Sequence, residues 1–172
     1  MAISFVIALL QVTTLTGMPT ENRQIVQVLF NWIHVGDFSL DLSLRLDALS
    51  AVMILVITGI GTLIHLYSTS YMHDETDAEF ARYFSYLNLF ASFMLVLVLG
   101  ASFLVLFVGW EGVGLCSYLL IGFYFKERKN GNAAMKAFIV TRVGDVFMAF
   151  GLFILFVQLG TLNIQELATC AT

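Results

Sequence analysis

Five ionisable side chains lie within or at the edges of long apolar runs of this chain. They are Glu111, Arg142, Asp145, Lys136 and His65. At the centre of a lipid bilayer a charged side chain costs on the order of 2.5–3.5 kcal/mol, unless it is paired or hydrated. Residues kept against such a cost commonly carry protons or other cations. The chemistry that these residues suggest is therefore proton or cation transfer within a membrane.

Glu111 is the most informative of the five. No basic residue lies within fourteen positions of it along the chain. It therefore needs a partner from another helix, a file of water, or a pKa raised far enough to keep it neutral. An acid in that situation suits a proton relay, because burial brings its pKa towards the working pH.

Arg142 and Asp145 are three residues apart, so they project from the same face of a helix. They could act with Glu111, or they could form a purely structural ion pair within their own helix. Lys136 lies near the start of the same apolar run, where its long side chain could reach the membrane surface. His65 has an equally plain alternative as a satisfied interior histidine.

Small residues surround Glu111 and favour close helix packing there. Gly109, Gly112, Gly114 and Cys116 remove side-chain bulk, and Gly112 with Cys116 has the small-xxx-small spacing of membrane helix interfaces. Ser117 and Tyr118 add hydroxyl groups that could hold a chain of water. These residues predict that Glu111 faces protein rather than lipid.

The composition requires lipid around these runs. Hydrophobic residues make up 59% of the 172 residues and charged residues 12%, about half the charged share of a soluble domain. The mean hydropathy is +0.90. This excludes a soluble enzyme, a disordered tail and a disulfide-rich fold. The net charge of −4 argues against a nucleic-acid partner, and Cys116 and Cys170 have no metal-ligand spacing.

The predicted fold class is all-α, a polytopic transmembrane helix bundle with about five spanning helices. A span needs roughly 20 mostly apolar residues, and the runs are continuously apolar rather than alternating as in a membrane barrel. The first run lacks the basic start and cleavage site of a signal peptide. The predicted spans are 1–18, 48–71, 84–99, 103–125 and 133–159.

The connections predict the orientation. Arg82, Lys126, Arg128 and Lys129 share the face of the N-terminus, whereas Arg23 and Arg45 lie on the other, and the positive-inside rule then places the N-terminus in the cytoplasm. The spacing of Phe, Ile, Val and Trp32 over 24–38 suggests a short interfacial segment in the first connection.

Two sequence runs resemble a known family. The run WEGVGLCSYLLIGF at 110–123 and the run AMKAFIVTRVGD at 134–145 are similar to signatures of the subunit L (chain 5) family of the proton-pumping NADH–quinone oxidoreductase, respiratory complex I. The stretches LDALS at 46–50, LIHLYS at 63–68 and RYFSYLNLF at 82–90 fit the same pattern. The resemblance covers roughly residues 30–167.

The resemblance implies an antiporter-like membrane subunit that moves protons through half-channels. The essential acid of the family corresponds to Glu111, and the functional arginine and aspartate of its second motif correspond to Arg142 and Asp145. Lys136 belongs to that motif as well. The family pairs its glutamate with a lysine on a later, interrupted helix, which this sequence does not contain. Residues 1–172 are therefore expected to form one membrane region that is incomplete relative to the family.

The resemblance also implies the surroundings of the chain. The family carries no redox centre, so no cofactor is expected here, and NADH, FMN, iron–sulfur clusters and quinone are expected on other subunits. The expected partners are other membrane-arm subunits, above all the neighbouring antiporter-like subunit, and the lipid bilayer. The run IGFY at 121–124 is closer to bacterial than to mitochondrial versions, which favours a bacterial inner membrane.

Two other interpretations stay open. One is the corresponding antiporter-like subunit of an Mrp-type sodium/proton antiporter, which shares the helix plan and an acid at this place but lacks the wording of the 110–123 run. The other is a truncated, non-conducting structural remnant, because the lysine-bearing helix is missing. Sodium-dependent transport without NADH oxidation would favour the first of these.

Overall fold

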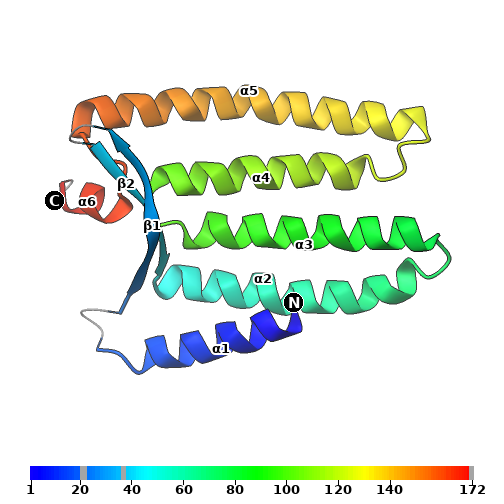
Figure 1. Ribbon diagram of the computed structural model, residues 1–172, viewed down its shortest axis with the longest axis horizontal. Helices are drawn as coiled ribbons and strands as arrows, with labels where there is room; N and C mark the ends of the chain where they lie inside the picture. The colour runs from blue at the N-terminus through cyan, green and yellow to red at the C-terminus, as the bar shows by residue number, and fades with distance from the viewer. Residues whose placement is uncertain (20–22, 36–37, 171–172) are drawn as a thin grey trace.

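The structure is a computed structural model that describes residues 1–19, 23–35 and 38–170, and it forms a row of long helices with a β-hairpin across one end (Figure 1). In chain order the elements are α1 (Ala2–Thr16), β1 (Ile25–Val35), β2 (Phe38–Leu46), α2 (Ala48–Tyr71), α3 (Asp77–Leu99), α4 (Phe103–Ile121), α5 (Arg128–Leu159) and α6 (Ile164–Cys170).

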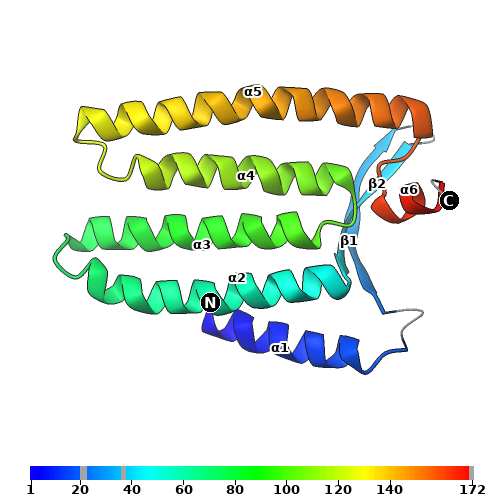
Figure 2. The same ribbon diagram turned by 180° about the vertical axis from the view of Figure 1, so that it is seen from behind.

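Helices α1 to α5 lie side by side in sequence order, each packed against the next (Figure 2). Consecutive helices from α2 to α5 run in opposite directions. Connections 72–76 and 122–127 therefore lie together, at what we call the loop end. The hairpin, connection 100–102 and α6 lie at the opposite end, the hairpin end.

The predicted fold class, a helical membrane bundle, is confirmed for the greater part of the described chain. Helices α2, α3, α4 and α5 are each long and apolar enough to cross a membrane. The run predicted as a span at 1–18 forms α1, which has 15 residues and is shorter than the roughly 20 that a span needs.

The helices differ from the predicted spans mainly at their polar ends. Helix α3 begins at Asp77 rather than at 84, because the Thr76 side chain caps it and two acids occupy its first turn. Helix α4 ends at Ile121 rather than at 125, and α5 begins at Arg128 rather than at 133. An apolar run marks the part of a helix that faces lipid, whereas capping residues decide where the helix begins and ends.

The segment predicted as a short interfacial stretch at 24–38 is instead largely a β-strand. Strand β1 pairs antiparallel with β2, and the register shifts between Val28 and Phe30 and again between Asn31 and Ile33. The Ala101 amide donates to the Ser43 carbonyl oxygen at 3.1 Å, so the hairpin is joined to the connection between α3 and α4.

The start of α2 is fixed by Asp47. Its carboxylate accepts from the Ser50 amide at 2.9 Å and from the Arg45 guanidinium at 2.6 Å, and the Ser50 hydroxyl accepts from the Asp47 amide. Burial raises the pKa of Asp47, but the hydrogen bonds from Ser50 and Arg45 outweigh burial and bring that pKa below its usual value. This capping box also attaches the end of β2 to α2.

Two glycines of α4 set its distance from α3, as the small-residue pattern predicted. A Cβ atom at Gly109 would lie 2.6 Å from the Leu97 backbone, and one at Gly112 would lie 2.2 Å from the Phe93 ring. Since neither position has room for a side chain, this close approach of the two helices depends on glycine. The packing fixes which face of α4 is left for α5.

Candidate functional site

Three of the five predicted residues meet at the middle of the helix row. Glu111 lies halfway along α4, and Arg142 and Asp145 lie halfway along the neighbouring α5. Because α4 and α5 are antiparallel neighbours (Figure 1), their midpoints fall at the same depth. We call Glu111, Arg142 and Asp145 the charge cluster.

The guanidinium of Arg142 serves both carboxylates of the charge cluster. It forms an ion pair with the Glu111 carboxylate, donates to the Glu111 main-chain oxygen at 3.0 Å, and lies 3.6 Å from the Asp145 carboxylate. The side chain of Asp145 is 8% exposed, whereas those of Glu111 and Arg142 are each 28% exposed. Glu111 thus has a partner from another helix, and Arg142 and Asp145 share one helix face.

Trp110 is part of this site, although its place in the sequence did not single it out. Its indole Nε1 donates to the Asp145 carboxylate at 2.8 Å. An indole N–H in an apolar environment needs an acceptor, and this requirement was the signal that could have identified Trp110. The bond gives Asp145 a second partner besides Arg142.

Two α4 and α5 residues shape the space around the Arg142 guanidinium. It lies over the Phe138 ring, 4.5 Å from the ring centre, which is a favourable cation–π contact. A Cβ atom at Gly114 would lie 3.1 Å from its Nη2 atom, so glycine leaves room for the guanidinium against α4. Its Nε atom is buried and has no hydrogen-bond partner among the described residues.

His65 and Lys136 lie apart from the charge cluster. The Nδ1 atom of His65 is 2.7 Å from the Gly61 carbonyl oxygen, and the imidazole faces Phe84 of α3 at 5.9 Å between ring centres. Its Nε2 atom is buried without a partner in the described part of the chain. Lys136 is exposed on α5. The structure therefore brings together three of the five predicted residues.

The charge cluster can hold a variable number of protons. An arginine stays charged, so one guanidinium faces two carboxylates that compete for it. A carboxylic acid beside a cation releases its proton readily, and one that has lost its cation retains the proton. Across residues 1–19, 23–35 and 38–170, no group of three His, Cys, Asp or Glu residues is placed to hold a metal ion.

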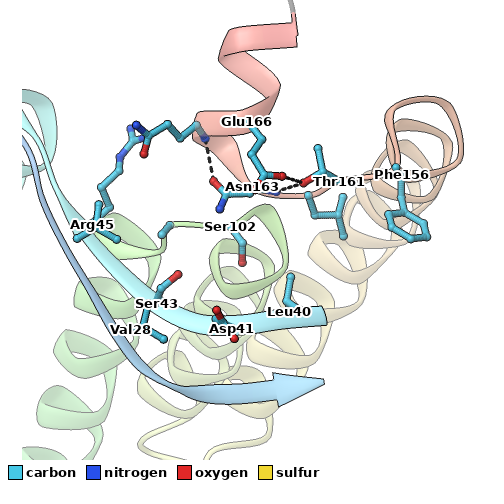
Figure 3. A pocket seen from close by; sticks show the side chains of 15 residues that line it. Val28, Leu40, Asp41, Ser43, Arg45, Ser102, Phe156, Thr161, Asn163 and Glu166 are labelled. Carbon is cyan, nitrogen blue, oxygen red and sulfur yellow. Dashed lines mark hydrogen bonds between the residues drawn. The ribbon is translucent and has the colours of Figure 1, made fainter. Parts of the chain in front are cut away.

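The largest cavity lies away from the charge cluster, at the hairpin end. It has a volume of about 530 Å³, and Figure 3 shows it between Asp41 and Ser43 of the hairpin and Asn163 and Glu166 after α5. Phe156, which also lines it, is eleven residues beyond Asp145 on α5, or about 16 Å along the helix. The cavity is therefore separate from the proton-holding residues.

Two family profiles match the chain. Residues 32–84 match the profile described as NADH-ubiquinone oxidoreductase (complex I), chain 5 N-terminus. Residues 100–172 match the profile described as NADH:quinone oxidoreductase/Mrp antiporter, TM. The second match contains all three residues of the charge cluster.

Curated relatives carry the same name. The chain is 61% identical to NADH-quinone oxidoreductase subunit L of Pseudomonas aeruginosa over 89% of its own length and 25% of the relative. It is 57% identical to subunit L of Escherichia coli over 84% of its length and 23% of the relative. The chain thus spans about a quarter of the length of these relatives.

A solved structure supports the fold. It is the membrane-bound sulfane sulfur reductase, an archaeal respiratory membrane complex, and a chain of it matches with a TM-score of 0.66 at 22% identity, over 97% of this chain and 24% of that chain. The profiles and the relatives agree on a narrower group. The chain belongs to the subunit L (chain 5) family of NADH–quinone oxidoreductases.

Proposed function

We propose that this chain contributes the proton-binding half of a proton-translocating membrane subunit of NADH–quinone oxidoreductase. The observation that supports this most directly is the pairing of Glu111 with Arg142 at the middle of two neighbouring helices. The relatives named subunit L point to the same role. On this proposal, quinone reduction elsewhere in the complex drives the protons across the membrane.

In this mechanism Arg142 moves between two carboxylates. When it pairs with Glu111, Glu111 is held ionised, and when it moves towards Asp145, Glu111 takes up a proton. The 3.6 Å separation of Arg142 from Asp145 makes a small movement sufficient. No bond is made or broken except the O–H bond of Glu111, so the site needs no redox group.

The surroundings follow from the same proposal. The chain works as a subunit of an oxidoreductase, with NADH, FMN, iron–sulfur clusters and quinone held by other subunits. Its partners are the other membrane-arm subunits, in particular the neighbouring antiporter-like subunit. The membrane is the bacterial inner membrane, in keeping with the bacterial relatives.

The test is Glu111→Gln in the full-length protein within the intact complex. The amide keeps the size of the side chain but cannot be ionised, so we expect a strong loss of proton pumping per NADH oxidised. The matched control is Glu75→Gln, an acid of the loop end whose amide still accepts the hydrogen bond from Tyr124. Unaltered proton-to-electron stoichiometry and turnover in Glu111→Gln would contradict the proposal.

A second candidate function is that of an Mrp-type sodium/proton antiporter, because the profile matching residues 100–172 includes Mrp antiporters in its description. The charge cluster would then exchange sodium for protons. Sodium-dependent proton movement in membranes that oxidise no NADH would favour this function. Proton pumping that depends on NADH and not on sodium would favour the first.

A further inference from the structure

Three cavities follow one another along the seam between α4 and α5, from the loop end to the charge cluster. The outer cavity, of about 400 Å³, lies at the loop end and is lined by charged residues that include Arg82 and Lys126. The middle cavity is about 190 Å³. The inner cavity, about 260 Å³, is lined by Trp110 and Asp145. Each is large enough for several water molecules, at about 30 Å³ apiece.

Shared residues connect these three cavities. Arg82, Phe123 and Phe125 line both the outer and the middle cavity. The Arg82 guanidinium lies 4.9 Å and 5.0 Å from the centres of the two rings. Tyr118 lines both the middle and the inner cavity, and its ring contacts Phe138 beneath Arg142. The seam is therefore one series of adjoining spaces.

The polar groups along the seam suit water rather than lipid. Ser117, Tyr118 and Thr141 bring three hydroxyl groups to the inner cavity, next to Asp145. Arg82 and Tyr86 bring further donors to the middle cavity. Since buried water binds where two to four polar partners converge, these groups can hold a continuous file.

The seam is apolar beyond the charge cluster. Residues 103–109 of α4 and 146–155 of α5 contain no charged side chain. About 16 Å of α5 separates Asp145 from the wall of the hairpin-end cavity (Figure 3). Within the described chain, polar access to the charge cluster is therefore from the loop end.

We propose that the α4–α5 seam is a hydrated path by which protons reach the charge cluster from the loop end, with the Tyr118 hydroxyl as the relay between the middle and inner cavities. The phenol oxygen accepts a proton from a water molecule on one side while its own proton passes to a water molecule on the other, so the residue ends unchanged. The inference deepens the proposed function and rests on it.

The first experiment measures water access directly. Ser117→Cys and Leu115→Cys are each made in full-length protein with Cys116→Ala, in the intact complex, and are treated with a small charged methanethiosulfonate reagent. Ser117 lines the inner cavity, whereas Leu115 is an exposed apolar residue of the same helix. We expect Ser117→Cys to react about tenfold faster or more from the loop side, because the reactive thiolate forms only in water.

Labelling at each site is measured by mass spectrometry of the corresponding peptide, with reagent added on one side of the membrane at a time. Equal rates at the two positions would overturn the path. So would reaction of Ser117→Cys only from the hairpin side, or no reaction from either side. NADH oxidation by each variant shows that the complex has assembled.

The second experiment separates the relay from water access. Tyr118→Phe removes the hydroxyl and keeps the ring, so Ser117→Cys should stay reactive in that background. Pumping should slow and show a larger solvent deuterium isotope effect. Tyr67→Phe, an exposed tyrosine of α2, is the control. Unchanged pumping and isotope effect in Tyr118→Phe would overturn the relay.

The two proposals fail in distinguishable ways. If Glu111→Gln abolishes pumping but Ser117→Cys is no more reactive than Leu115→Cys, the path is wrong and the function of the charge cluster stands. If Glu111→Gln pumps normally while Ser117→Cys reacts from the loop side, the seam is hydrated but does not serve the proposed function.

Discussion

Asp145 accepts a hydrogen bond from Trp110 that competes with its pairing to Arg142. The indole bond is 2.8 Å, and the guanidinium lies at 3.6 Å. A carboxylate already satisfied by one donor attracts a second cation less strongly, so Trp110 favours the pairing of Arg142 with Glu111. Trp110 is in this sense a positioning residue for the acid.

Trp110→Phe tests this role. A hydrogen bond to a charged group is worth about 1.5–3 kcal/mol, so its loss should shift the distribution of Arg142 towards Asp145 by about tenfold or more. We expect slower pumping and a displaced pH profile of pumping, while Trp32→Phe in β1 leaves both unchanged. An unchanged pH profile in Trp110→Phe would show that Asp145 does not need the indole.

At this scale the sequence predicted the need of Glu111 for a partner, but not the partner. Arg142 is 31 residues away, and its reach depends on how α4 and α5 are rotated against each other. That rotation is set by contacts between helices, such as the Tyr118 ring on Phe138 and Gly112 against Phe93. A single sequence contains no record of such contacts, so several arginines and lysines remained possible.

The hairpin is the element that the sequence did not predict. Strand β2, with the sequence FSLDLSLRL, alternates strictly between apolar and polar residues, which is a strand pattern. Strand β1 does not alternate, because register shifts near Phe30 and Ile33 interrupt its pairing. Its apolar residues with Trp32 therefore resembled an interfacial stretch, although the neighbouring β2 carried the informative pattern.

The close packing of α3 on α4 predicts a stability effect at Gly109. In Gly109→Ala the new Cβ atom would meet the Leu97 backbone, which cannot rotate away as a side chain can. Overpacking of this kind costs about 1–3 kcal/mol, so the detergent-solubilised complex should unfold at a lower temperature. Gly151→Ala in α5, where nothing lies within 4 Å, is the matched control, and an equal unfolding temperature for both variants would contradict the packing argument.

On the scale of the whole molecule, the helix order predicts which segments share a side of the membrane. The two loop connections lie together and the hairpin lies opposite (Figures 1 and 2), and most of the basic residues of the connections belong to the loop end. By the positive-inside rule, the loop end faces the cytoplasm. A membrane-impermeant maleimide should therefore label His73→Cys from the cytoplasmic side and Gln27→Cys from the other. Labelling of both from one side would contradict this arrangement.

The two ends of the row are held together by interactions of unequal strength. At the hairpin end, main-chain hydrogen bonds join Ala101 to Ser43, Phe103 to Leu162 and Ile164 to Ala101. At the loop end, the connections meet through exposed side-chain pairs, Lys126 with Glu79 and Tyr124 with Glu75. The bond to Glu75 raises the pKa of Tyr124 to about 12, so that contact persists at neutral pH. Exposed pairs of this kind contribute little, about 0–1 kcal/mol each.

A row of rods fastened firmly at one end deflects most at the other. We therefore expect α4 and α5 to separate by rocking about the hairpin end, with the largest change in spacing near connections 72–76 and 122–127. The middle of the helices, where the charge cluster lies, would then move by an intermediate amount, on the scale of the exchange of Arg142 between two carboxylates. The hairpin would thereby act as the pivot of the site.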